Sequence, residues 1–126
     1  MEEIEAELQR AGINPGSYRL TWFSSGLRQG RHVARRNSTF DPWQRDQDGR
    51  TNIERMLDGY APLDREGNEV VLHHVMQRDS GPLIEMTYRE HRSIPILRDP
   101  SQINRSQHDS FRRDYWRDRA KDFLKP

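Results

Sequence analysis

Residues 69–91 read EVVLHHVMQRDSGPLIEMTYREH and contain three of the five histidines in the chain. The β-branched residues of 69–76 predict a strand, RDSGP predicts a loop, and residues 83–86 predict a second short strand. Residues 87–90 have the Thr-x-x-Glu pattern of a capping box, so a helix is expected to start there and to carry His91 in its first turn. The predicted order is strand, loop, strand and helix, with histidines on the first strand and on the helix.

The adjacent pair His73 and His74 lies within the first predicted strand. Side chains alternate along a strand, so these imidazoles should point to opposite faces, and both can serve one site only if the strand twists or ends there. Imidazoles can hold a divalent metal ion such as Mg²⁺, Zn²⁺ or Ni²⁺, and a further imidazole can take a proton from an attacking water. This order matches a ββα-metal hairpin, in which the first strand carries the base and the helix carries a ligand.

The remaining segments predict shorter elements around this hairpin. Helices are expected at residues 2–11, from Asp41 and Pro42 onward, at 51–58, and at 110–124 with Asp109 or Ser110 as cap, together with a strand near 18–23 and a turn at 64–68. The rest of the N-terminal third is interpreted as irregular. Helical spacing and aromatic character predict these core residues: Ile4, Leu8, Ile53, Met56, Leu57, Phe111, Tyr115, Ala120, Phe123, Leu124, Trp22, Trp43 and Trp116. His32 and His108 are interpreted as structural.

The charges are distributed unevenly, although the net charge of the chain is only +1. Residues 17–50 hold seven Arg against three Asp, and residues 98–126 hold six Arg and two Lys against five Asp. Arg accounts for 19 of the 21 basic residues, and its planar guanidinium suits bidentate phosphate contacts. A coding bias toward Arg explains the composition equally well. Arg113, Arg117 and Lys121 are spaced four residues apart, so they lie along one side of the predicted helix. That side is either solvated or binds phosphates, and the arginines of 28–36 are further candidates for phosphate contacts.

The length of 126 residues favours one domain, and 32% hydrophobic residues imply a small core. The chain has no cysteine, which excludes disulfides, thiolate metal sites and cysteine nucleophiles. It contains no apolar run of membrane-spanning length, and its acidic start does not resemble a signal peptide. A secreted protein with this sequence would therefore be exported as part of something larger.

The triplet Leu72-His73-His74 stands among further motifs: Gly-Asn-Glu before it, then Gln77, Gly81-Pro82, Glu85, Glu90-His91 and Tyr115-Trp116 after it. Together these motifs resemble the LHH family, a branch of the HNH/endonuclease VII nuclease superfamily found at the C-termini of bacterial polymorphic toxins. The resemblance covers roughly residues 50–120. It implies an α+β fold with a ββα-metal (HNH or treble-clef-like) hairpin and short helix, packed by flanking helices.

The resemblance also implies roles for single residues. His74 would be the general base, His73 a metal ligand or its support, and His91 the ligand on the helix. Glu85 would be a further ligand or the group that orients the base. The candidate substrate-binding residues are Gln77, Arg78, Arg113 and Arg117. Where related sequences often have a second histidine after the helix, this chain has Arg98, so the ligand set is smaller or His108 replaces it.

The implied function is a metal-dependent nuclease, with DNA favoured as the substrate. The resemblance implies an antibacterial toxin domain, secreted as part of a larger toxin, acting in the target-cell cytoplasm and neutralised in the producer by a cognate immunity protein. A ribonuclease toxin of the same fold is one alternative. A non-catalytic nucleic-acid-binding module is another, although a structural metal site needs four protein ligands. We expect residues 1–45 to be a scaffold or junction and residues 46–126 to be the nuclease core, within one folding unit and without a membrane partner.

Overall fold

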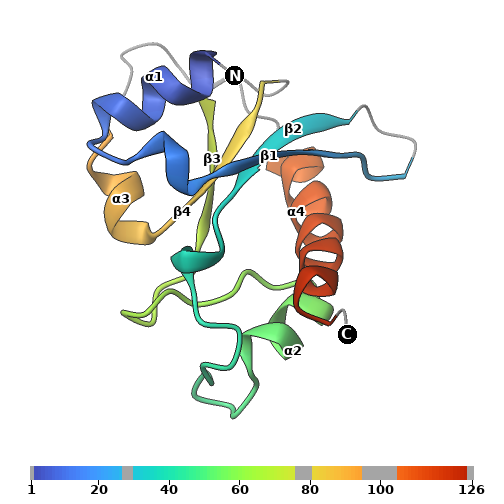
Figure 1. The fold of residues 1–126 in the computed structure, drawn as a ribbon. Coiled ribbons are helices and arrows are strands. Elements are labelled where there is room, and N and C mark those ends of the chain that lie inside the picture. The colour runs from blue at the N-terminus through green and yellow to red at the C-terminus, as the bar shows by residue number, and fades with distance from the viewer. Residues whose placement is uncertain (1, 27–29, 76–80, 95–104, 125–126) are drawn as a thin grey trace.

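The computed structural model describes residues 2–26, 30–75, 81–94 and 105–124, without the side chains of residues 105–108. A four-stranded sheet with the order β1-β2-β4-β3 has helices on both faces (Figure 1). This architecture confirms the predicted α+β class. Its elements are α1 (Glu2–Arg10), β1 (Arg19–Phe23), β2 (Arg31–Arg35), α2 (Asn52–Leu57), β3 (Val71–His74), β4 (Leu83–Met86), α3 (Tyr88–Arg92) and α4 (Arg105–Ala120). None of the helices in these ranges is long and apolar enough to span a membrane.

The predicted hairpin and helix are present at residues 71–92. Strands β3 and β4 pair antiparallel, with His73 opposite Ile84 and His74 opposite Leu83. Thr87 caps α3 through a complete capping box. Its hydroxyl accepts from the backbone N–H of Glu90 at 3.1 Å, and the Glu90 carboxylate accepts from the backbone N–H of Thr87 at 3.0 Å. The short helix therefore starts where the Thr-x-x-Glu pattern places it, and it contacts both strands of the hairpin.

The N-terminal third contributes two strands to the same sheet. β1 pairs antiparallel with β2, and β2 runs parallel to β4. The expected strand near 18–23 is confirmed by β1, but the interpretation of the following segment as irregular is wrong because β2 lies there. The sequence RHVAR lacks the alternating hydrophobic pattern that predicts a strand. Arg35 is nevertheless buried, because it forms ion pairs with Asp118 and Asp122.

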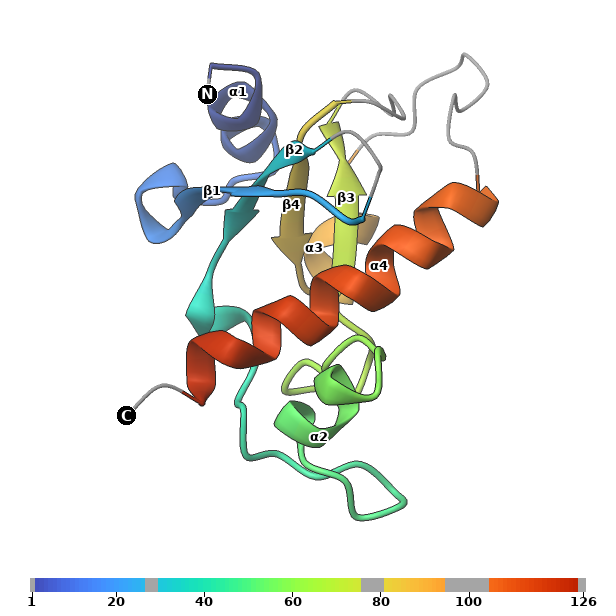
Figure 2. The same ribbon diagram turned by 90° about the vertical axis from the view of Figure 1, so that its right-hand side faces the viewer.

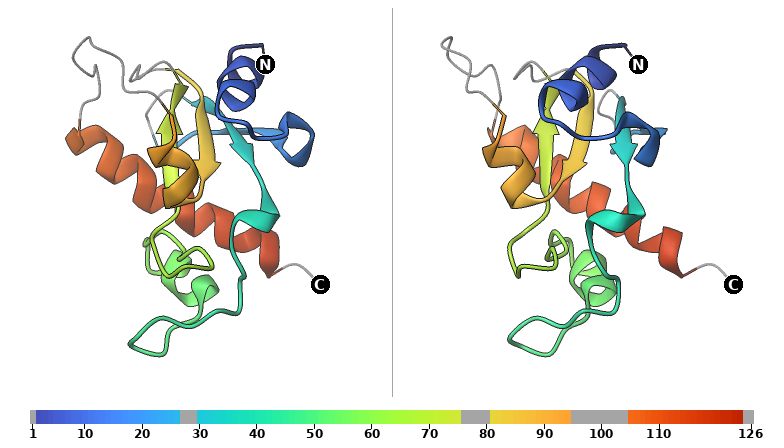
Figure 3. Two further views of the ribbon diagram at one scale, coloured as in Figure 1. Left: turned by 90° about the vertical axis from the view of Figure 1, so that its left-hand side faces the viewer. Right: turned by 60° about the vertical axis from the view of Figure 1, so that its left-hand side comes forward.

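The core consists of two layers, one on each face of the sheet. Helix α4 covers one face (Figure 2), where Leu72 and Leu83 of the hairpin pack with Tyr115 and Trp116 of the helix. Helices α1 and α3 lie on the other face (Figure 3), where Ile4, Leu8, Ile84 and Met86 form a second cluster. The predicted inward positions of α1 and α4 are confirmed for Ile4, Leu8, Phe111, Tyr115 and Ala120.

Three local predictions need correction. No helix follows Asp41, because its carboxylate accepts the N–H of Trp43 at 2.9 Å and closes a turn instead. Helix α4 begins at Arg105 rather than at a cap near Ser110. Leu57 and Leu124, both predicted in the core, are 46% and 53% exposed, because each lies at the end of a short helical segment and faces outward. The turn at residues 64–68 is confirmed by the hydrogen bond from the N–H of Asp64 to the carbonyl of Asn68.

The three tryptophans do not share one environment. Trp116 is 1% exposed and belongs to the core, as predicted. Trp22 and Trp43 are 61% and 68% exposed, so their assignment to the core is wrong. Trp22 instead contacts the ring of His32 edge-on across β1 and β2, with the centroids 4.9 Å apart. Composition cannot separate these cases, because a strand or turn at the surface can carry an aromatic side chain outward.

Candidate active site

His73 lies on the sheet face that α1 and α3 cover. Its side chain is 6% exposed, and its Nε2 atom is 2.9 Å from Oε1 of Glu7 in α1. The ring of His91 in α3 is its other neighbour, with 5.3 Å between the ring centroids and 61° between the planes. The hairpin and the capped helix thus bring together the two histidines that the sequence assigned to metal binding.

The electrostatic environment of His91 favours the neutral imidazole. Burial, and then the neighbouring charge of His73, lower the pKa of His91 below its usual value. A histidine must be neutral to donate its lone pair to a metal ion, so a lowered pKa extends ligation toward lower pH. Imidazole nitrogens are donors that divalent ions such as Zn²⁺ and Ni²⁺ accept, and His73 and His91 place two of them on one face. Within the described ranges, no group of three or more His, Cys, Asp and Glu side chains is arranged to hold a metal.

His74 lies on the opposite face of the hairpin. It stands across from Leu83, which belongs to the core layer under α4, and it is 5% exposed. His74 is also the last residue of β3, and β3 is at an edge of the sheet. The alternation expected from sequence is therefore present, and the strand ends at the pair. Both imidazoles are buried, His73 on the face that α1 and α3 cover and His74 on the face that α4 covers.

Glu85 is held in a buried ion pair on the α4 face, away from His73 and His91. Its Oε2 atom accepts from Nε of Arg119 at 2.7 Å and from the hydroxyl of Tyr115 at 2.6 Å. Its Oε1 atom accepts from Nη2 of Arg119 at 3.1 Å and from the N–H of Arg36 at 3.1 Å. Both charged side chains are 0% exposed. Its oxygens thus neutralise Arg119, which gives Glu85 a structural role, and its assignment as a ligand or as a partner of the base stays a prediction.

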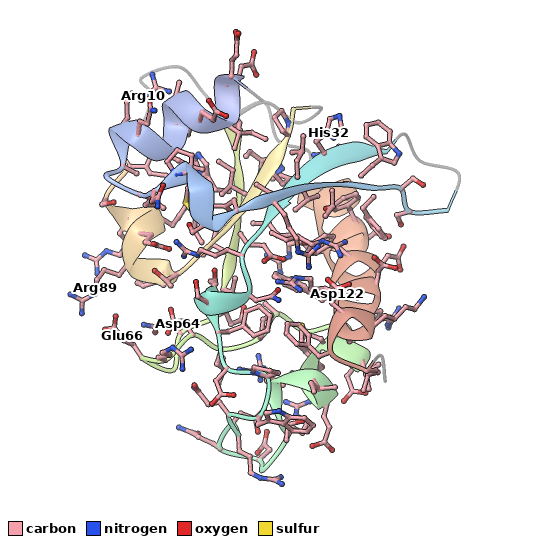
Figure 4. All side chains as sticks on the ribbon, in the orientation of Figure 1. Arg10, His32, Asp64, Glu66, Arg89 and Asp122 are labelled. Carbon is pink, nitrogen blue, oxygen red and sulfur yellow. The ribbon has the colours of Figure 1, made fainter. Side chains whose placement is uncertain are left out.

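The arginines divide into buried and exposed groups. Arg35 pairs with Asp118 and Asp122, the latter labelled beside α4 in Figure 4, and Arg36 pairs with Glu90 at 2.5 Å. These two arginines stabilise the fold and are not available as the phosphate contacts considered from the sequence. Arg113 and Arg117 of α4 are exposed, in agreement with either interpretation of that helix face.

Two cavities between the start of β3 and α4 share Arg112 and Trp116 and are together called the groove here. A cavity of about 340 Å³ is lined by residues 70–72, which precede the histidine pair, and by Tyr88, Arg112 and Trp116. A second cavity of about 390 Å³ is lined by Arg112, Arg113 and Trp116 and also by the acidic residues Asp58, Glu69 and Asp109. Aromatic and arginine side chains at such a position can contact bases and phosphates. Gln77, Arg78, Arg98 and the side chain of His108 lie outside the described residues.

The LHH family, described as a nuclease of the HNH/ENDO VII superfamily with conserved LHH, matches residues 51–122. The chain belongs to the LHH family. Membership makes it a nuclease with a nucleic acid as substrate, and members of the superfamily generally use a divalent metal. The LHH triplet is Leu72-His73-His74, at the C-terminal end of β3. No solved structure matches the chain.

Sequence reasoning missed Glu7, which lies before the part matched by the LHH family. The signal was present in the helical spacing of α1, because Glu7 is three residues after Ile4 and directly before Leu8. Residues at this spacing share one face of a helix. An acidic side chain on the buried face of an amphipathic helix needs a partner in the fold, and the partner here is His73.

Proposed function

We propose that the chain is a metal-dependent endonuclease that hydrolyses phosphodiester bonds in DNA. The supporting observation is that the rings of His73 and His91 lie on one face of the hairpin with their centroids 5.3 Å apart, while His74 ends β3 on the opposite face. His73 and His91 would hold a divalent ion, and His74 would accept the proton of the attacking water. Imidazole donors suit Zn²⁺ and Ni²⁺ better than Mg²⁺. When bound, the ion would stabilise negative charge on the phosphate and the leaving oxygen.

The substrate would lie along the groove between β3 and α4, on the face of the hairpin that carries His74. Exposed Arg113 and Arg117 would bind phosphates, and Tyr88 and Arg112 line the part of the groove nearest the hairpin. Gln77 and Arg78 remain candidates for substrate contact from the sequence alone. Attack by water does not need a 2′-hydroxyl, so hydrolysis by this site extends to DNA. RNA is the alternative substrate, because the described residues include no group that reads the sugar.

The biological context follows from the family resemblance and is part of the proposal. We infer an antibacterial toxin domain that is secreted within a larger polymorphic toxin and acts in the cytoplasm of the target cell. A cognate immunity protein would neutralise it in the producer. Cytoplasmic expression of the chain should then arrest bacterial growth with loss of DNA, whereas expression of His74→Ala should not. Growth arrest with intact DNA would contradict the proposed substrate.

The direct test is cleavage of supercoiled plasmid and of total RNA by the purified chain, with and without EDTA. We expect plasmid cleavage that EDTA abolishes and that His74→Ala lowers by about two to four orders of magnitude, the usual contribution of a general base. Near-parental cleavage by the folded variant would remove His74 from the mechanism. Full activity in EDTA would exclude metal catalysis. Binding without cleavage under every metal condition would favour the non-catalytic module.

A further inference from the structure

Helix α1 places a carboxylate on the histidine that the proposed function assigns to the metal. The side chain of Glu7 is 8% exposed, and its neighbours on the same helix face, Ile4 and Leu8, are 1% and 0% exposed. These apolar residues anchor α1 in the core layer that also contains Ile84. The position of Glu7 is thus set by packing, and its oxygen meets His73 at hydrogen-bond distance.

The two oxygens of Glu7 face different groups. Oε1 is 2.9 Å from Nε2 of His73, inside the fold. Oε2 accepts from Nη2 of Arg10 at 2.6 Å, and Arg10 lies at the outer surface of α1 (Figure 4) with its side chain 62% exposed. Arg10 favours the charged carboxylate, which is an acceptor only. The hydrogen between Glu7 and His73 therefore belongs to Nε2 of the imidazole.

We propose that Glu7 is a positioning residue that fixes the ring orientation and the tautomer of His73. With Nε2 donating to Glu7, the lone pair of the neutral ring is on Nδ1, which becomes the ligating atom. Metal-bound histidines commonly donate their other N–H to a carboxylate, and this contact raises the basicity of the ligand. The proposal rests on the assignment of His73 as a ligand in the proposed function. It makes α1, outside the family match, a part of the site.

The spectroscopic test is the tautomer of His73 in ¹⁵N-labelled protein without metal. Long-range ¹H–¹⁵N spectra above neutral pH should show Nε2 protonated and Nδ1 unprotonated in the parent. Glu7→Ala should shift His73 toward a mixture of tautomers, because the acceptor is gone. The exposed residue Glu5 provides a matched control on the same helix, and Glu5→Ala should keep the parental spectrum. An unchanged His73 signal in Glu7→Ala would overturn the positioning role.

The functional test is the affinity for Zn²⁺ and Ni²⁺ measured by calorimetry, with urea unfolding of each variant to verify the fold. Loss of such a carboxylate partner should weaken metal binding about 10- to 100-fold. Glu7→Gln keeps the volume and an acceptor oxygen, so it should give an intermediate loss even if Glu7→Ala does not fold. The variant His73→Ala separates the ligand role of His73 from the positioning role of Glu7. Parental metal affinity in this variant would overturn both the ligand assignment and this proposal. Weak binding in His73→Ala with parental binding in both Glu7 variants would overturn the positioning role alone.

Discussion

Replacement of Glu85 with Gln tests whether this residue holds the fold together or serves the metal. The change removes the negative charge that Arg119 contacts at 2.7 and 3.1 Å, where both side chains are 0% exposed. Breaking a buried ion pair by changing one partner costs about 3–5 kcal/mol. Arg119 also donates to Asp122 at 2.9 Å and to Asn37 at 2.9 Å, so part of its charge stays compensated. We therefore expect the lower end, about 3 kcal/mol.

Urea unfolding followed by tryptophan fluorescence measures this loss, because Trp116 is buried only in the folded state. With a urea dependence of about 1–3 kcal/mol per molar, the midpoint should fall by roughly 1–3 M. The control is Glu66→Gln, which breaks the surface ion pair between Glu66 and Arg89 (Figure 4), whose side chains are 51% and 79% exposed. Exposed pairs contribute little to stability, so its midpoint should stay at the parental value.

An unchanged urea midpoint in Glu85→Gln, together with metal affinity reduced tenfold or more, would refute this reasoning. Glu85 would then act at the metal, as the family resemblance implied. If Glu85→Gln does not fold, Tyr115→Phe is the milder variant, because it removes only the hydroxyl that donates to Glu85 at 2.6 Å. A hydrogen bond to a charged group contributes about 1.5–3 kcal/mol. A smaller midpoint shift is therefore expected for Tyr115→Phe, with parental metal affinity.

Three further predictions concern the groove, acid stability and folding. The double variant Arg113→Gln, Arg117→Gln should flatten the salt dependence of DNA binding by about one unit per lost phosphate contact. The control Arg89→Gln on α3 should leave it unchanged. An unchanged slope in the double variant would mean that this face of α4 is only solvated. The pKa of Asp46 is lowered from 3.8 to about 2, chiefly by the hydrogen bond from Arg55. The charged carboxylate therefore stabilises the fold above pH 3.8, and this contribution is lost as the pH falls toward about 2. Asp46→Asn should thus reduce the pH dependence of the urea midpoint in that range, and equal pH dependence in both proteins would contradict this. Unfolding by circular dichroism and by Trp116 fluorescence should coincide if residues 1–45 and 46–126 form one unit, because β2 and β4 share the sheet.

The sequence by itself predicted the hairpin and helix that carry the histidines. Its signals there are short-range: the capping box joins Thr87 to Glu90, and the turn at residues 64–68 closes on its own backbone. The opposite orientation of His73 and His74 also follows from the period of a strand. Such features depend on residues a few positions apart, so local chemistry is sufficient to predict them.

Only the tertiary structure placed Glu85 on the sheet face opposite His73 and brought Glu7 to His73. Glu85 and Arg119 are 34 residues apart, and Glu7 and His73 are 66 residues apart. The buried arginine of β2 likewise depends on aspartates at the far end of the chain. Burial of a charge is favourable only when its partner is in place, and that partner comes from a distant element. The sequence thus predicted which residue types surround the site. Which charged side chains pair with one another was decided by the packing of α1 and α4 on the two faces of the sheet.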